Sequence, residues 1–224
     1  MIISLTGFMG CGKSSVGRRL SELLCCPFMD LDDVIVESAG RSIPEIFATE
    51  GEKSFRQMEL EALKQIITPS VMSQCAPLAP SHFVGPSPYA GVRKCQFRTS
   101  VSSPEPITLV LALGGGAVMT PECAQIVKEQ TCCIYLKASI ETLMEHLSGE
   151  ADGRPMLQGK AESQEAGTSL RGAERRGNPL EERITNLMAQ RSETYEKTSH
   201  IIIDTDGKSI EAVACEICTI LSIQ

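Results

Sequence analysis

The chain has 224 residues, and its hydrophobic content of 42% is enough for the core of one domain. A formal net charge of −7 argues against a surface that holds a nucleic-acid backbone. No run of eighteen apolar residues and no secretion signal is found, so we expect a soluble, cytoplasmic monomer that binds neither nucleic acid nor a membrane.

The first predicted elements enclose a glycine-rich loop. Ile2–Thr6 is an apolar run that predicts a strand, and apolar residues recur at helical spacing from Ser15 to Leu24. Between them, the segment from Gly7 to Ser14 fits the pattern G-x-x-x-x-G-K-S/T, whose backbone N–H groups cradle phosphates. We expect ATP to be bound by Gly10, Cys11, Gly12, Lys13, Ser14 and Ser15. Lys13 would reach the β- and γ-phosphates as a catalytic residue, and the Ser14 hydroxyl would bind Mg²⁺.

A second predicted strand, Phe28–Leu31, carries acidic residues to the same edge of the sheet. Alternation along an extended chain would place Asp30 and Asp32 on one side of that strand, at the edge where open α/β sheets bind ligands. Asp30 would hold hydrated Mg²⁺, and Asp32 would accept a proton or a hydrogen bond from an acceptor hydroxyl. The alternative is that Asp32 or Asp33 only caps the following helix.

Capping signals predict three further helices. The segment Ser42-Ile43-Pro44-Glu45 has the spacing of a capping box and therefore predicts the start of a helix. Gly51 is expected to end that helix. A second helical run begins at Lys53 and stops before Thr68-Pro69, because proline pushes the preceding residue out of the helical region. Thr120 is expected to cap a helix whose first residue is Pro121.

Three more apolar runs complete the predicted sheet. They cover Ile107–Leu113, Cys132–Leu136 and Ile201–Asp204, and helical patterns separate them from the first two strands. This alternation predicts an α/β fold, with a five-stranded parallel sheet flanked by helices on both faces. We expect residues 1–224 to form a single domain, with an irregular, proline-rich insertion at about 69–106 and an extended lid at about 148–180.

The ten cysteines do not form a recognisable metal-binding pattern. Cys215 and Cys218 make a lone C-x-x-C without a second pair or histidines at zinc spacing. We expect free thiols in a reducing compartment.

Taken together, the motifs resemble those of the shikimate kinase family in the right order over nearly the whole chain. They are Gly7 to Ser14, Asp30-x-Asp32, Gly40-Arg41-Ser42-Ile43 with Ile46-Phe47, Glu50-Gly51-Glu52-x-x-Phe55-Arg56-x-x-Glu59, Leu113-Gly114-Gly115-Gly116-Ala117, Arg154-Pro155-x-Leu157 and Arg191-x-x-x-Tyr195. A phosphate loop alone is shared by many kinases and GTPases, but the combination specifies an acceptor. The resemblance implies a P-loop kinase fold with a mobile lid.

The resemblance also implies a reaction, transfer of the γ-phosphoryl group of ATP to the 3-hydroxyl of shikimate with Mg²⁺. The guanidinium groups of Arg56 and Arg191 would hold the shikimate carboxylate, with Glu59 orienting Arg56 through an i,i+3 contact. The acceptor would also contact the backbone of the glycine turn formed by Gly114, Gly115 and Gly116. In this contact the Gly115 N–H would bind the shikimate carboxylate. Arg154, carried by the lid, would bind ATP and act with Lys13 to neutralise charge during transfer.

One departure from the family pattern concerns the adenine side. Family members usually have an arginine shortly before the lid that stacks on adenine, whereas this chain has Glu145-His146-Leu147-Ser148, so His146 would stack in its place. Two other interpretations stay open at this point. One is a kinase of another small hydroxy acid, of the gluconate type, and the other is a catalytically silent nucleotide-binding module.

Overall fold

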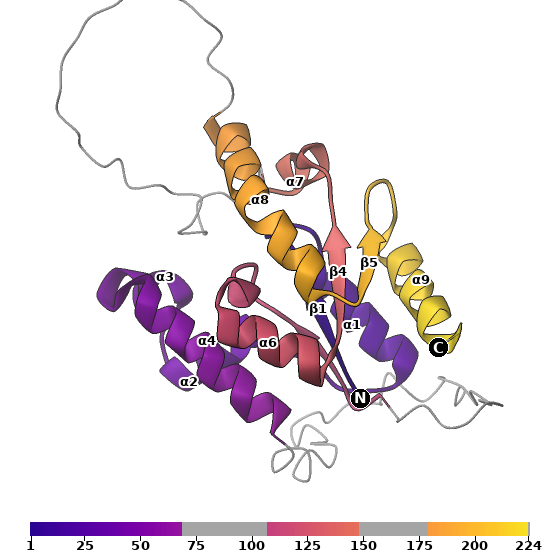
Figure 1. Ribbon diagram of the computed structural model, residues 1–224, viewed down its shortest axis with the longest axis horizontal. Coiled ribbons are helices and arrows are strands. Elements are labelled where there is room, and N and C mark those ends of the chain that lie inside the picture. Colours follow the sequence, from indigo (N-terminus) through magenta and orange to yellow (C-terminus); the bar gives the residue numbers. More distant parts are fainter. Residues whose placement is uncertain (69–106, 148–178, 224) are drawn as a thin grey trace, which may run out of the picture.

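A computed structural model describes residues 1–68, 107–147 and 179–223 of the chain. Its centre is one sheet of five parallel strands in the order β2-β3-β1-β4-β5, of which β1, β4 and β5 are labelled in Figure 1. The strands are β1 (Ile2–Thr6), β2 (Phe28–Asp30), β3 (Leu109–Ala112), β4 (Cys132–Lys137) and β5 (Ile201–Asp204). The five-stranded parallel sheet predicted from the sequence is confirmed.

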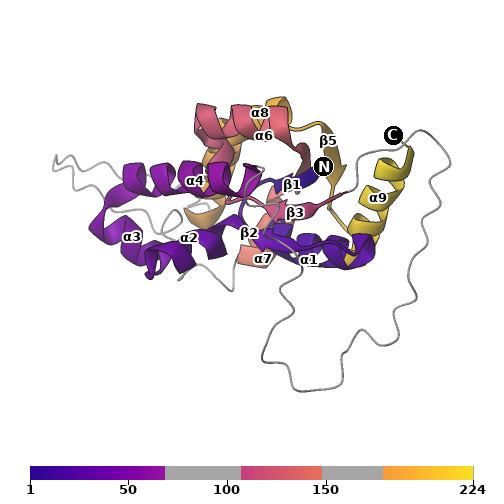
Figure 2. The same cartoon turned by 90° about the horizontal axis from the view of Figure 1, so that it is seen from below.

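Helices cover both faces of this sheet. They are α1 (Lys13–Leu24), α2 (Leu31–Ala39), α3 (Ile43–Thr49), α4 (Gly51–Ile67), α6 (Pro121–Gln130), α7 (Ile140–Leu147), α8 (Pro179–Thr198) and α9 (Ile210–Ile223), with a 3₁₀ turn, η1, at Ala117–Met119. Seen from below in Figure 2, α4, α6 and α8 lie on one side of the sheet and α1 lies on the other. Helix α9 packs against α1.

The central strands are apolar without alternation because helices cover them from both sides. All five residues of β1 and all four of β3 are buried. Some of the polar side chains inside are paired, as in the 2.7 Å hydrogen bond that joins the hydroxyls of Ser4 and Thr131, whereas the hydroxyls of Thr6 and Tyr135 have no hydrogen-bond partner within the described residues. None of the helices in the described ranges is long and apolar enough to cross a membrane.

The predicted starts of α3 and α6 are confirmed, whereas α4, predicted from Lys53, begins two residues earlier, at Gly51. Helix α3 begins after Ser42 with the capping box to Glu45 in place. Gly51, with φ of +80°, separates α3 from α4, and α4 ends at Ile67, directly before Thr68. Thr120 is the N-cap of α6, whose first residue is Pro121.

The boundary of the second strand was predicted wrongly. We expected an extended chain through Leu31, but β2 stops at Asp30 and Leu31 already starts α2. Asp30 is the N-cap of α2, since its Oδ1 accepts a hydrogen bond of 3.1 Å from the Asp32 N–H. Asp30 and Asp32 therefore do not share one side of a strand. A cap and the first turn of a helix bring them to the sheet edge instead.

Two predictions cannot be placed on this fold. The insertion at 69–106 lies outside the described residues. So does the predicted lid, apart from its last two residues, which belong to the start of α8.

Candidate active site

The phosphate loop connects β1 to α1 in the geometry that the motif requires. Gly10 and Gly12 have φ of +83° and +87°, in the left-handed region that a side chain disfavours. Gly12 is the N-cap of α1, and Lys13 is the first residue of that helix. The loop thus leads directly into a helix N-terminus, where backbone N–H groups and the helix dipole favour an anion.

Lys13 holds the loop together from inside. Its Nζ donates hydrogen bonds to the carbonyls of Gly7, at 3.0 Å, and Phe8, at 2.9 Å. An ammonium group has three N–H donors. These bonds hold the positive charge of Lys13 beside the strand-to-loop turn, within the cavity described below.

Ser14 and Asp30 are in direct contact at the foot of the loop. The Ser14 hydroxyl donates to Asp30 Oδ2 over 2.5 Å, and the other oxygen of Asp30 is occupied by the cap of α2. A hydroxyl and a carboxylate are both oxygen ligands of the kind that Mg²⁺ prefers. Mg²⁺ in kinases is typically held by one or two protein ligands together with substrate phosphates, so two donors at this place suit it.

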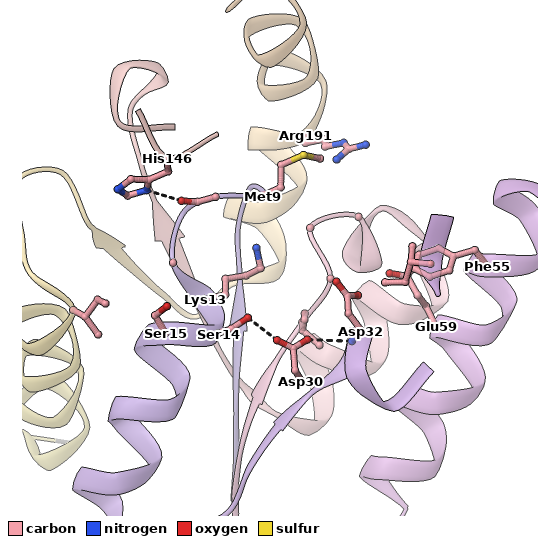
Figure 3. A pocket seen from close by; sticks show the side chains of 18 of the residues that line it. Met9, Lys13, Ser14, Ser15, Asp30, Asp32, Phe55, Glu59, His146 and Arg191 are labelled. Atoms are coloured by element: carbon pink, nitrogen blue, oxygen red, sulfur yellow. Dashed lines mark hydrogen bonds between the residues drawn. The ribbon is translucent and has the colours of Figure 1, made fainter. Parts of the chain in front are cut away.

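One cavity of about 950 Å³ brings the two halves of the predicted site together. Figure 3 shows Lys13, Ser14, Asp30 and Asp32 from the N-terminal elements, with Arg191 reaching in from α8. The predicted site residues that line the cavity are Gly10, Gly12, Lys13, Ser14, Ser15, Asp30, Asp32, Arg56, Gly114, Gly115, Gly116 and Arg191. Cys11 is not among the lining residues, because its side chain is buried beneath the loop with 4% exposure. Arg154 lies outside the described residues.

The glycine turn that follows β3 is packed against charged side chains. A Cβ atom at Gly114 would lie 2.7 Å from Asp32 Oδ1 and 2.9 Å from Glu59 Oε1. A Cβ atom at Gly116 would lie 2.5 Å from both terminal nitrogens of Arg56. The sequence suggested that these glycines allow a close approach to a ligand. The structure adds that the protein's own carboxylates and guanidinium fill the space.

Arg56 is fixed by carboxylates on its own helix. Its Nη1 donates to Glu59 Oε2 over 2.5 Å, and its Nη2 donates to Glu52 Oε1 over 3.0 Å. The i,i+3 contact predicted with Glu59 is therefore confirmed. Phe55 and Phe47, whose ring centroids are 4.8 Å apart, form an apolar part of the same cavity wall.

Arg191 has a different environment. It is 7% exposed, and no carboxylate of the described residues forms an ion pair with it. Buried arginines are rare without a partner for their charge. An acidic group of a ligand in this cavity would supply one.

Glu59 is a fully buried carboxyl group. Burial raises its pKa to about 7, although the charge of Arg56 opposes the shift and the charge of Asp32 adds to it. Its Oε2 is bonded to Arg56, while its Oε1 has no hydrogen-bond partner within the described residues. Nothing in the sequence indicated this burial, because a glutamate one turn after an arginine is most often solvated.

We expect Glu59 to make the stability of the protein depend on pH. A carboxyl group whose pKa is raised on folding binds its proton more tightly in the folded state, so its contribution is present at low pH and is lost as the pH rises. Between pH 4.5 and about 7, the free energy of unfolding of the wild type should fall, relative to Glu59→Gln, by about 3 kcal/mol at most. Urea unfolding of both proteins across this range measures the difference. The exposed Glu61 on the same helix provides the control, since Glu61→Gln should leave the pH dependence unchanged.

Two contacts in the site were not foreseen. His146 Nδ1 lies 2.8 Å from the Gly10 carbonyl, so the imidazole packs on the phosphate loop (Figure 3). The hydroxyl of Tyr195 donates a hydrogen bond to the Gly115 carbonyl, which ties α8 to the glycine turn. The motif Arg191-x-x-x-Tyr195 was visible in the sequence, but nothing in it indicated the partner of the tyrosine.

Comparison with known proteins gives a consistent result. The family model described as shikimate kinase matches residues 9–76 and 98–222. A shikimate kinase of Thermus thermophilus is 33% identical over 215 residues, covering 96% of this chain and 86% of that protein. That of Geobacter metallireducens is 35% identical over 215 residues, with 96% and 88% covered.

Solved structures show the same similarity. Shikimate kinase from Acinetobacter baumannii in complex with shikimate superimposes with a TM-score of 0.70 at 26% identity, covering 100% of this chain and 94% of that one. The shikimate kinase from Aquifex aeolicus has a TM-score of 0.63 at 25% identity, with 99% and 96% covered. The match thus includes both the sheet and the elements that surround the cavity.

Proposed function

The chain belongs to the shikimate kinase family, and we propose that it transfers the γ-phosphoryl group of ATP to the 3-hydroxyl group of shikimate. Its activity is the ATP-dependent phosphorylation of shikimate. The observation that carries the finer proposal is the convergence of Arg56 and Arg191, from α4 and α8, on the cavity that Lys13 also lines. A cationic pair beside a phosphate loop suits an acceptor that carries a carboxylate.

The nucleotide occupies the side of the cavity formed by the phosphate loop. The backbone of Gly10 to Ser15 binds the phosphates, and Lys13 contacts the β- and γ-phosphates. His146, held against the Gly10 carbonyl, stays our candidate for the adenine contact. When bound, Mg²⁺ would be held by Ser14 and Asp30 and would neutralise the charge of the phosphates.

Shikimate occupies the opposite side, between α4, the glycine turn and α8. Arg56 and Arg191 hold its carboxylate together with the Gly115 N–H, and these contacts select which ring hydroxyl faces the phosphate. Asp32 accepts the proton of that hydroxyl, and its position in the cavity lining beside Gly114 supports this assignment. Glu59 keeps Arg56 in place from behind.

The transfer itself exchanges one phosphorus–oxygen bond for another. The bond between the shikimate oxygen and the γ-phosphorus forms as the bond from that phosphorus to the β,γ-bridging oxygen breaks, and the hydroxyl proton passes to Asp32. Lys13 stabilises the charge that develops on the phosphoryl and leaving oxygens, and we propose that Arg154 joins it when the lid closes. Positioning supplies most of the rate enhancement, because the phosphoryl group needs little covalent assistance.

An acceptor comparison tests this proposal. Purified protein with ATP and Mg²⁺ should release ADP rapidly only when shikimate is present, and removal of Mg²⁺ by a chelator should stop the release until the metal is restored. Proton NMR of the product should show phosphate on the 3-oxygen. Equal ADP release with and without shikimate would contradict the assignment, and turnover of gluconate in place of shikimate would favour a kinase of the gluconate type.

A further inference from the structure

Tyr195 connects two parts of the proposed acceptor site that are far apart in the sequence. It lies on α8 one helical turn after Arg191, so both side chains belong to the same face of that helix. Its ring is completely buried, and its hydroxyl donates a hydrogen bond to the carbonyl of Gly115, 80 residues away. A buried tyrosine hydroxyl requires a polar partner, and here that partner is the main chain of the glycine turn.

Arg191 interacts with the same hydroxyl. The guanidinium acts on Tyr195 both through its charge and as a hydrogen-bond donor, which lowers the pKa of the phenol, but burial has the larger effect and raises it. The hydroxyl therefore keeps its proton and can accept from Arg191 while donating to Gly115. The result is a chain of contacts from the guanidinium through the phenol to the peptide.

The Gly115 carbonyl is part of the peptide unit that also contains the Gly116 N–H. Because this unit is planar, a hydrogen bond that fixes the carbonyl also fixes the direction of the N–H. On its other side the turn meets the phosphate loop, since a Cβ atom at Gly115 would lie 3.2 Å from the Met9 nitrogen. Three glycines in sequence have no side chains of their own to hold the turn, so contacts of this kind define its conformation.

We propose that Tyr195 is a positioning residue for the acceptor carboxylate, whose hydroxyl aligns the glycine turn with the Arg191 guanidinium. This inference rests on the proposed function, because it assigns the alignment to the carboxylate end of shikimate. Tyr195 does not contact the reacting atoms. It acts through Arg191 and through the glycine turn, whose Gly115 N–H lies in the peptide unit directly before the one that the Tyr195 hydrogen bond holds.

The chain contains a matched control for this proposal. Tyr135 on β4 is also completely buried, and its ring stacks on Tyr195 with centroids 5.2 Å apart. Within the described residues, however, the Tyr135 hydroxyl has no hydrogen-bond partner. Tyr135→Phe and Tyr195→Phe therefore remove the same atom from the same pair of rings, but only the second change removes the bond to Gly115.

The two variants should separate cleanly in steady-state kinetics. Tyr195→Phe should raise the KM for shikimate by about tenfold, the size expected when a buried carbonyl loses its partner, while the KM for ATP stays within about twofold. Tyr135→Phe should leave both constants unchanged. The shikimate-induced rise in melting temperature, which needs no turnover, should be reduced in Tyr195→Phe and normal in Tyr135→Phe.

A further comparison assigns the effect to the carboxylate. With an acceptor in which a hydroxymethyl group replaces that carboxylate, wild type and Tyr195→Phe should turn over equally slowly. A wild-type KM for shikimate in Tyr195→Phe, or equal increases in the KM values for ATP and shikimate, would overturn the proposal. Failure of the wild type to phosphorylate shikimate would instead refute the proposed function itself.

Discussion

Replacing Lys13 with alanine is expected to lower kcat for shikimate phosphorylation by about 10²–10³-fold, the range found when one preorganised group that stabilises the transition state is removed. The ammonium group of Lys13 is held at the phosphate loop by the carbonyls of Gly7 and Phe8. The loss should appear in kcat more than in the KM for shikimate, because Lys13 lines the nucleotide side of the cavity. Assays that quantify shikimate 3-phosphate at fixed times, with both substrates saturating, measure this loss of kcat.

Lys64 offers a control for the charge change. It is exposed on α4, and it does not line the cavity. Lys64→Ala removes the same charge from the protein and should retain wild-type kcat. If Lys13→Ala kept more than about a tenth of wild-type kcat, the phosphate-loop assignment would be wrong, since the interaction would then be worth less than about 1.4 kcal/mol.

Removal of either arginine of the acceptor site should have the second large effect. Arg191→Ala and Arg56→Ala are each expected to lower kcat/KM for shikimate by about 10²–10³-fold, since truncating one partner of a desolvated charged pair costs about 2–5 kcal/mol. The KM for ATP should change little, because neither arginine belongs to the phosphate loop. Initial rates over a matrix of both substrate concentrations separate these constants.

The two arginine variants should differ in stability. Arg56→Ala leaves the buried Glu59 without the guanidinium that pairs with it, so its melting temperature should fall and should fall further above pH 7. Arg191 pairs with no carboxylate of the described residues, so Arg191→Ala should lose binding with a smaller loss of stability. Arg19→Ala serves as the control for the loss of an arginine charge, since the ion pairs of Arg19 with Glu211 and Glu22 lie on the surface. An unchanged KM for shikimate in Arg191→Ala would contradict the assigned carboxylate site.

Much of the fold was predictable because its signals are local. The glycine loop, the apolar strands and the capping residues of α3 and α6 each specify a short segment by themselves. The bounds of β1 and β5 were predicted without error. Strand β3 was predicted too long at both ends, because apolar residues continue past the hydrogen-bonded ladder, and β4 was predicted one residue too short, because it ends on the charged Lys137.

The site was less predictable where its geometry depends on long-range packing. Asp30 and Asp32 do lie at the cavity, but a helix cap brings them there, because an aspartate before a helix satisfies the free N–H groups better than continued strand would. The contacts of Gly114 and Gly116 with Asp32, Glu59 and Arg56 join separate elements, and no sequence spacing reports them. The hydrogen bond from Tyr195 to Gly115 likewise joins residues that are far apart in the sequence, so no spacing predicts it.

The contact between the glycine turn and the phosphate loop also limits how the acceptor range of this enzyme could be altered. A Cβ atom at Gly115 would lie 3.2 Å from the Met9 nitrogen, so a side chain at this position would press on the main chain of the phosphate loop. Ile43, Phe47 and Phe55 line the same cavity with apolar side chains, so they are the first positions to vary when altered selectivity is sought. A ligand designed to span both halves would have to pass this close contact between the glycine turn and the phosphate loop.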